Sequence, residues 1–186
     1  MVDRAKCTLY SGGLKGAETA FGEAAEKWGL QEVTLSYEGN VPTRDKNVVM
    51  LSEEELVRGD ISMELASKMM NRTYYEKKKI RKVLQSIFHM VNKGYQVFAV
   101  GKIMADNTVK GGTGWAVELA RLFNRPVSVY DQEKKEWFTW KEGAWKADTP
   151  CIEYDSITGS GTRNLNDDGK KAIEELFERS FGAALM

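Results

Sequence analysis

The apolar residues of the chain gather in short runs that alternate with stretches of helical periodicity. Short apolar runs bounded by glycine or proline predict strands, at Ala5–Tyr10, Glu32–Tyr37, Tyr95–Val100, Pro126–Tyr130 and Ile152–Ile157. Apolar residues spaced three and four apart predict helices, at Leu14–Trp28, Ser52–Met70, Tyr75–Asn92, Gly114–Phe123 and from Asn166 onward. Two short runs rich in tryptophan, Trp137–Trp140 and Ala144–Ala147, predict a small β-hairpin.

Strands that alternate with helices predict an α/β fold, with a mainly parallel sheet between two layers of helices. The chain has 186 residues, with no repeat, linker or low-complexity segment that would divide it. We therefore expect residues 1–186 to form a single domain. The polar segment Glu38–Val49 contains glycine and proline and predicts a loop. Ser52 and Glu55 have the spacing of a capping box, which marks the start of the next helix.

Composition excludes several functional classes. The 27 basic and 27 acidic residues give no net charge, which argues against a strongly basic nucleic-acid surface. The basic cluster at Lys77–Lys82 is interpreted as a solvated helix face. No run of about 18 apolar residues predicts a membrane span, and the first six residues lack the apolar core of a signal peptide, so we expect a cytoplasmic protein.

Cysteine and histidine are too few for most metal or nucleophilic chemistry. Cys7 and Cys151 lie in short apolar runs and are expected to be reduced core residues. His89 is the single histidine and falls in a helical pattern, so a metal site built on histidine or cysteine clusters is not expected. We predict no cofactor and no metal.

Glycine-rich turns follow three of the predicted strands, at Ser11–Gly16, Gly111–Gly114 and Gly159–Arg163. Glycine lets the backbone approach a ligand closely, and the free N–H groups at a helix start attract an anion. Ligands of open parallel sheets bind at the carboxyl ends of the strands, so the three turns are expected to line one crevice. One such turn is weak evidence, but three in one domain favour an anionic, nucleotide-like ligand.

Two of these turns resemble known motifs. Tyr10–Thr19 resembles the SGGAxGAD signature of the SLOG superfamily, and Gly111–Glu118 is similar to the PGGxGTxxE motif of its LOG-type phosphoribohydrolases. Glu118 falls on the glutamate of that motif. Lys110 stands where the motif has proline and Trp115 where it has threonine. The resemblance implies a Rossmann-like three-layer fold.

The third turn resembles the strand and GSR segment with which members of this superfamily begin, yet Ser156–Leu165 lies near the end of the chain. We therefore expect a circularly permuted order of elements. In a permuted fold the strand Ile152–Ile157 would pair beside Ala5–Tyr10. If this strand lay at the sheet edge, far from Ala5–Tyr10, the permutation hypothesis would be wrong.

The resemblance implies a ligand derived from a nucleotide, such as ADP-ribose or one of its cyclic isomers. The residues expected to bind it are Ser11, Gly12, Gly13, Lys15, Gly16, Lys102, Gly111, Gly112, Thr113, Gly114, Trp115, Glu118, Gly159, Ser160, Gly161, Thr162 and Arg163. Trp115 would stack on a base, with packing against a neighbouring helix as the alternative.

Three functions follow from the resemblance. The first hypothesis is sequestration of an immune signal by a phage-type protein in the host cytoplasm, because superfamily domains in defence systems bind such signals. The second is hydrolysis of the N-glycosidic bond of nucleoside 5′-monophosphates, in which Glu118 and Arg163 would be catalytic. The third, single-stranded nucleic-acid binding, is disfavoured by the net charge. A homodimer or higher homo-oligomer is expected, and no membrane partner.

Overall fold

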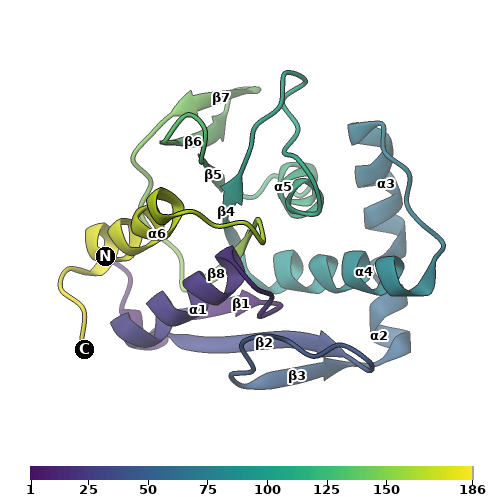
Figure 1. Ribbon diagram of the computed structural model, residues 1–186, viewed down its shortest axis with the longest axis horizontal. Helices are drawn as coiled ribbons and strands as arrows, with labels where there is room; N and C mark the ends of the chain where they lie inside the picture. The colour runs from purple at the N-terminus through teal and green to yellow at the C-terminus, as the bar shows by residue number, and fades with distance from the viewer. Residues whose placement is uncertain (186) are drawn as a thin grey trace.

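A single sheet of eight strands forms the centre of the computed structural model, which describes residues 1–185 (Figure 1). Its order is β3-β2-β1-β8-β4-β5-β6-β7. The strands are β1 Thr8–Ser11, β2 Gln31–Tyr37, β3 Val48–Leu51, β4 Gln96–Gly101, β5 Val127–Asp131, β6 Glu136–Lys141, β7 Ala144–Ala147 and β8 Ser156–Gly161. Strands β1 to β5 and β8 pair in parallel, and β6 and β7 add an antiparallel edge.

Helices cover both faces of this sheet, so the expected three-layer Rossmann-like α/β fold is confirmed (Figure 1). The helices are α1 Ala17–Trp28, α2 Glu53–Val57, α3 Asp60–Met70, α4 Lys78–Lys93, α5 Thr113–Leu122 and α6 Asp167–Phe181, preceded by a 3-10 turn at Arg4–Lys6. Helices α1 and α6 bury their apolar stripes in one core, and α3, α4 and α5 bury theirs in the other. All six residues of β4 are buried, as expected for a central parallel strand.

The last strand lies in the middle of the sheet, between β1 and β4. Its Ile157 pairs with Leu9 of β1 on one side and with Gln96 of β4 on the other. If β8 is counted as the first strand, the segment β2-β1-β8-β4-β5 has the order 3-2-1-4-5 of a doubly wound sheet. The last strand therefore pairs beside the first strand, as expected, and does not lie at the sheet edge. The guanidinium of Arg4 donates a hydrogen bond to the carbonyl of Ala183, so the two ends of the described chain lie together (Figure 1).

Several boundaries differ from the sequence predictions. The strand predicted from Ala5 begins at Thr8, because Arg4–Lys6 form a 3-10 turn, and the helices predicted from Leu14 and Tyr75 begin at Ala17 and Lys78. The predicted loop Glu38–Val49 ends in the edge strand β3, which adds its backbone to β2. The predicted helix Ser52–Met70 divides at Arg58 and Gly59, although the Ser52–Glu55 capping box is present. Strand β8 begins four residues later than the predicted start of the last strand, because Ile152 instead hydrogen-bonds through its N–H to Ser180 of α6.

The tryptophan-rich hairpin forms as predicted, as β6 and β7, and continues the main sheet beyond β5. Trp137 is buried against Phe98 and Tyr130. The Trp140 ring packs on Trp145 and carries the Arg121 guanidinium 3.6 Å from its centroid. Trp137 therefore anchors β6 in the core, whereas β7 remains largely exposed.

Candidate functional site

A cavity of about 630 Å³ opens where β1, β8 and β4 end, at their carboxyl ends. This is the position at which the strand order of a doubly wound sheet reverses and where ligands of such folds bind. Of the residues expected from sequence to bind a ligand, those that line it are Gly12, Lys102, Gly111, Gly112, Thr113, Ser160, Gly161, Thr162 and Arg163. A second wall is largely apolar and is formed by Leu35 of β2 and by Val83, Ile87 and Met90 of α4. A cavity of this size and mixed polarity suits a small organic ligand.

The first glycine turn is internally bonded. The N–H of Gly12 donates to the Glu18 carboxylate at 2.7 Å, and the N–H of Gly13 donates to the Ser11 hydroxyl at 3.2 Å. The N–H of Ala17, at the start of α1, donates to the carbonyl of Thr162. Gly16, with φ of 97°, makes this approach possible because a Cβ would strike the backbone of the third turn. These N–H groups are therefore already occupied by protein acceptors.

The second glycine turn is open. A Cβ at either Gly111 or Gly112 would meet nothing within 4 Å, and no side chain caps the start of α5 there. The N–H groups of Gly114 and Trp115 donate to the carbonyls of Gly111 and Gly112, whereas those of Gly112 and Thr113 have no acceptor within residues 1–185. Such N–H groups and the positive end of the helix dipole attract an anion. Lys110 and Lys102 line the same part of the cavity, although Lys102 also pairs with Glu133 at 3.0 Å. Of the three glycine turns, this one therefore has the most open backbone.

The third glycine turn differs from the sequence prediction, because its glycines lie within β8 itself. A Cβ at Gly159 would press on the Phe21 ring, and one at Gly161 would press on Ala17 and on the backbone of β4. These glycines therefore let α1 pack closely on the strand. The segment that follows the strand reaches the cavity and brings Arg163 into it.

Glu18 is a carboxylate in the cavity wall that the sequence analysis did not select. One oxygen accepts the Gly12 N–H, while the other is neither fully buried nor hydrogen-bonded within residues 1–185. Burial raises the pKa of Glu18 from its ordinary 4.5 to about 7, against the opposing effects of the Gly12 N–H and the Arg163 charge. Glu18 therefore directs an oxygen toward the cavity, and its pKa lies near neutral pH.

Tyr37 and Arg163 face the cavity from two further elements. Tyr37 ends β2 and is largely buried, which raises the pKa of its hydroxyl group, with the Arg163 charge again acting in the opposite direction. In residues 1–185 no ion pair or hydrogen bond engages the Arg163 guanidinium. All three residues line the same cavity, and the charge of Arg163 acts to lower the pKa of both Glu18 and Tyr37. They come from α1, β2 and the segment after β8.

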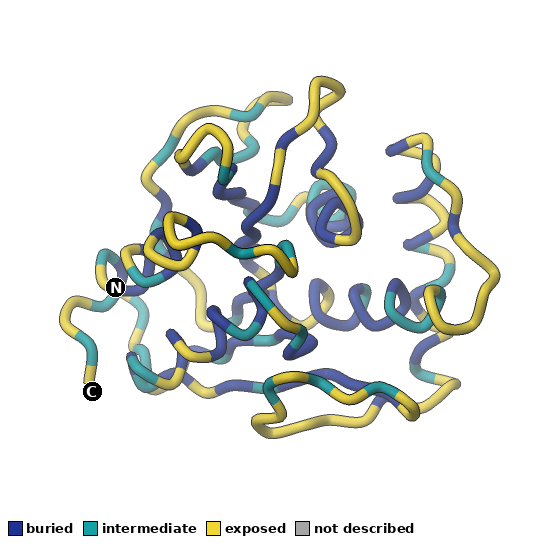
Figure 2. Tube along the Cα trace, in the orientation of Figure 1, coloured by how far each residue is buried: buried dark blue, intermediate teal, exposed yellow. Residues whose placement is uncertain are grey.

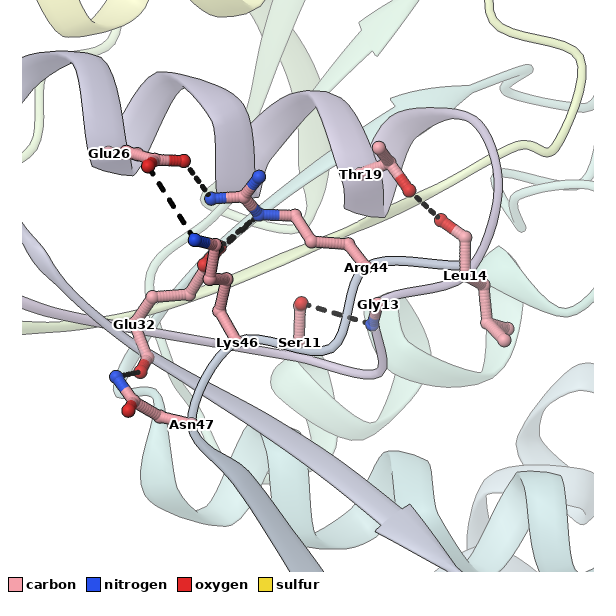
Figure 3. Close-up of polar contacts among 9 residues, drawn as sticks. All are labelled: Ser11, Gly13, Leu14, Thr19, Glu26, Glu32, Arg44, Lys46 and Asn47. Carbon is pink, nitrogen blue, oxygen red and sulfur yellow. Dashed lines mark hydrogen bonds and ion pairs between the residues drawn. The ribbon is translucent and has the colours of Figure 1, made fainter. Parts of the chain in front are cut away.

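The loop before β3 clamps the first turn (Figure 3). The backbone N–H of Arg44 donates to the carbonyl of Gly13 at 2.9 Å. The Arg44 side chain crosses to β2 and α1, where it pairs with Glu32 at 2.8 Å and with Glu26 at 2.7 Å (Figure 3). The predicted loop is thus fixed over the turn, and Asn40 of this loop lines the cavity.

Several residues expected to bind ligand lie outside the cavity lining. They are Ser11, Gly13, Lys15, Gly16, Gly114, Trp115, Glu118 and Gly159. Trp115 is buried with its ring 6.1 Å from that of Tyr74, so the packing alternative describes its position. Glu118 is buried and pairs with Arg121 at 3.2 Å, and burial raises its pKa while Arg121 lowers it.

Comparisons with protein-family models, with curated proteins and with solved structures found no match to this chain. Within residues 1–185, no group of three histidine, cysteine, aspartate or glutamate side chains is arranged to hold a metal ion. None of the helices described combines the length and the apolar character needed to cross a membrane.

Proposed function

We propose that the cavity binds a small molecule derived from a nucleotide and retains it without turnover. The observation that carries this proposal is the convergence of Glu18, Tyr37 and Arg163 on one cavity that also contains the open turn at Gly111 and Gly112. A phosphate would lie at the start of α5, and the rest of the ligand would extend toward the three polar side chains.

The charges around the cavity favour an anion. Lys110 and Arg163 supply positive charge, and the raised pKa of Glu18 leaves its carboxyl group about half protonated at neutral pH. The oxygen of Glu18 that faces the cavity would accept a hydrogen bond from a ribose hydroxyl, and the Tyr37 hydroxyl is available as a donor. The apolar wall of α4 offers a surface for the flat face of a base.

Retention without turnover is preferred because the glutamate that the motif comparison offered for catalysis, Glu118, lies outside the cavity and pairs with Arg121. Sequestration of a nucleotide-type immune signal by a phage-type protein accords with such a site and remains part of this proposal.

A hydrolase is the second candidate, favoured by Glu18 itself. A carboxylate that faces the cavity is the group that would stabilise a cationic ribosyl state during cleavage of an N-glycosidic bond. In this case Glu18 would take the role that the motif comparison gave to Glu118.

One incubation separates the two. The purified protein is mixed with AMP, other nucleoside monophosphates, ADP-ribose and cyclic ADP-ribose isomers, freed of unbound ligand, heat-denatured and analysed by mass spectrometry. Recovery of one intact compound in stoichiometric amount is expected. Free base and ribose 5-phosphate that accumulate with the wild type, and not with Glu18→Gln, would establish the hydrolase instead. Equal recovery from Arg163→Ala would contradict the proposed site.

A further inference from the structure

Four large apolar side chains form an exposed stripe along α2 and α3. Val57, Ile61, Leu65 and Met69 follow one another at intervals of four residues, with exposed fractions of 54%, 79%, 48% and 50%. The backbone of Arg58 and Gly59, between the two helices, keeps right-handed helical angles, so the stripe continues from α2 into α3. In Figure 1, α3 stands at the edge of the molecule, beside α5 and α4.

The fold does not use this stripe. The opposite face of α3 carries Met63, Ala66 and Met70, which are buried in the core shared with α4 and α5. A surface helix normally has one apolar stripe, and a helix that is apolar on two faces normally buries both. Exposed and buried residues alternate along α3 in Figure 2, which shows this second face open to solvent. The stripe is therefore available for contact with another protein surface.

The area of the stripe fits a specific contact. Its four side chains expose roughly 400 Å², within the range of the largest apolar patch on a typical monomer. That is about half of the surface that each partner buries in a standard protein interface, and the polar rim of an interface supplies the remainder.

We propose that a second copy of this chain covers the stripe, with α3 packed antiparallel against its counterpart across a twofold axis near Leu65. The two copies of Leu65 then face each other, and Ile61 lies opposite the partner's Met69. Such a contact is self-complementary, as a twofold interface requires.

The charges on the rim of the stripe agree with this pairing. Glu64 and Lys68 are both exposed and flank the stripe one helical turn apart. An antiparallel arrangement about Leu65 brings Glu64 near the partner's Lys68, and Lys68 near the partner's Glu64. Opposite charges thus meet on both sides of the axis, which a parallel pairing in register would not achieve.

The test is the association state of the full chain, measured by sedimentation velocity over a wide range of concentrations. The wild type is expected to be a dimer. Leu65→Glu should raise the dissociation constant of the dimer by roughly 100-fold or more, because two carboxylates would face each other at the axis. Val41→Glu adds the same charge at an exposed loop position and should leave the dimer intact. Circular dichroism of each variant checks that the fold is retained.

Charge reversal provides an independent check of the geometry. Glu64→Lys alone and Lys68→Glu alone should each weaken the dimer, and the two together should restore it. A wild type that stays monomeric at every concentration would overturn the proposal. So would a dimer that survives Leu65→Glu but dissociates with Met50→Glu, because the exposed edge strand β3 would then be the contact.

Discussion

The carboxylate of Glu18 accepts a hydrogen bond of 2.7 Å from the backbone N–H of Gly12, in the turn where the sequence predicted an anionic ligand. An internal carboxylate thus replaces the external anion at the first glycine turn. The N-terminus of α5, at Gly112, then remains as the open position that would suit an anion. The first glycine turn instead fixes the Glu18 side chain. The cavity consequently combines an anion position with a titratable carboxyl group.

Glu18 should make stability depend on pH. Its pKa in the folded state, about 7, lies above the ordinary 4.5, so the folded protein holds this proton more tightly than the unfolded chain. The stabilisation is complete below about pH 4.5 and is lost as the pH rises through 7. Glu18→Gln lacks this loss. The free energy of unfolding of Glu18→Gln, taken relative to that of the wild type, should therefore increase by about 3 kcal/mol between pH 4.5 and pH 8.

Urea unfolding of both proteins between pH 4.5 and pH 8 measures this difference. Parallel curves for wild type and variant would show that Glu18 titrates normally, and the account of its burial would then be wrong.

Arg163→Ala should weaken the binding of a phosphorylated ligand without reducing stability. The side chain is exposed to the cavity, and removal of one charge-assisted hydrogen bond typically costs about 1.5–3 kcal/mol, or roughly 10- to 100-fold in affinity. Isothermal titration with the compound recovered from the incubation above gives the affinity. Lys171→Ala, an exposed lysine on α6, is the matched control and should bind as the wild type does. Unchanged affinity in Arg163→Ala would remove Arg163 from the site.

Arg44→Met should destabilise the protein through Glu32. The Glu32 side chain is only 7% exposed and would lose its cation, so we expect a cost of about 3 kcal/mol at pH 7. Burial already raises the pKa of Glu32, with Arg44 opposing that effect, and the variant should raise it further. The cost should therefore shrink as the pH falls and Glu32 takes up a proton.

Thermal and urea unfolding at pH 5 and pH 7 test this prediction. The double variant Arg44→Met with Glu32→Gln should recover most of the stability lost at pH 7, since no buried charge remains unpaired. If the double variant is as unstable as Arg44→Met alone, the clamp acts through packing and not through charge.

Glu118→Gln should leave ligand affinity within about twofold of the wild type, because the side chain lies outside the cavity lining and pairs with Arg121. The same titration measures it, with Glu18→Gln as the comparison that should change binding. If Glu118→Gln lost much of its ligand affinity and Glu18→Gln did not, the ligand would bind near the motif glutamate and not in the cavity.

The sequence by itself determined the elements and the class of fold. Short apolar runs located most of the strands, and apolar residues at helical spacing located most of the helices, because buried strands and one-sided helices leave these patterns. Asn166, predicted to cap the last helix, does accept the N–H of Gly169. Strand β3 was missed although Val48–Leu51 is a short apolar run, because four such residues beside a polar segment with glycine and proline do not by themselves distinguish an edge strand from a loop.

Which glycine turn is open to the cavity, and which carboxylate lines it, became clear from the folded arrangement alone. The same residue type serves close packing at Gly159, a tight turn at Gly16 and open space at Gly112, and the local sequence is similar in each case. Glu18 and Glu118 both lie on helices that follow glycine turns, yet only Glu18 lines the cavity. The difference arises from which neighbouring strand and loop each helix packs against, and these contacts join residues distant in sequence.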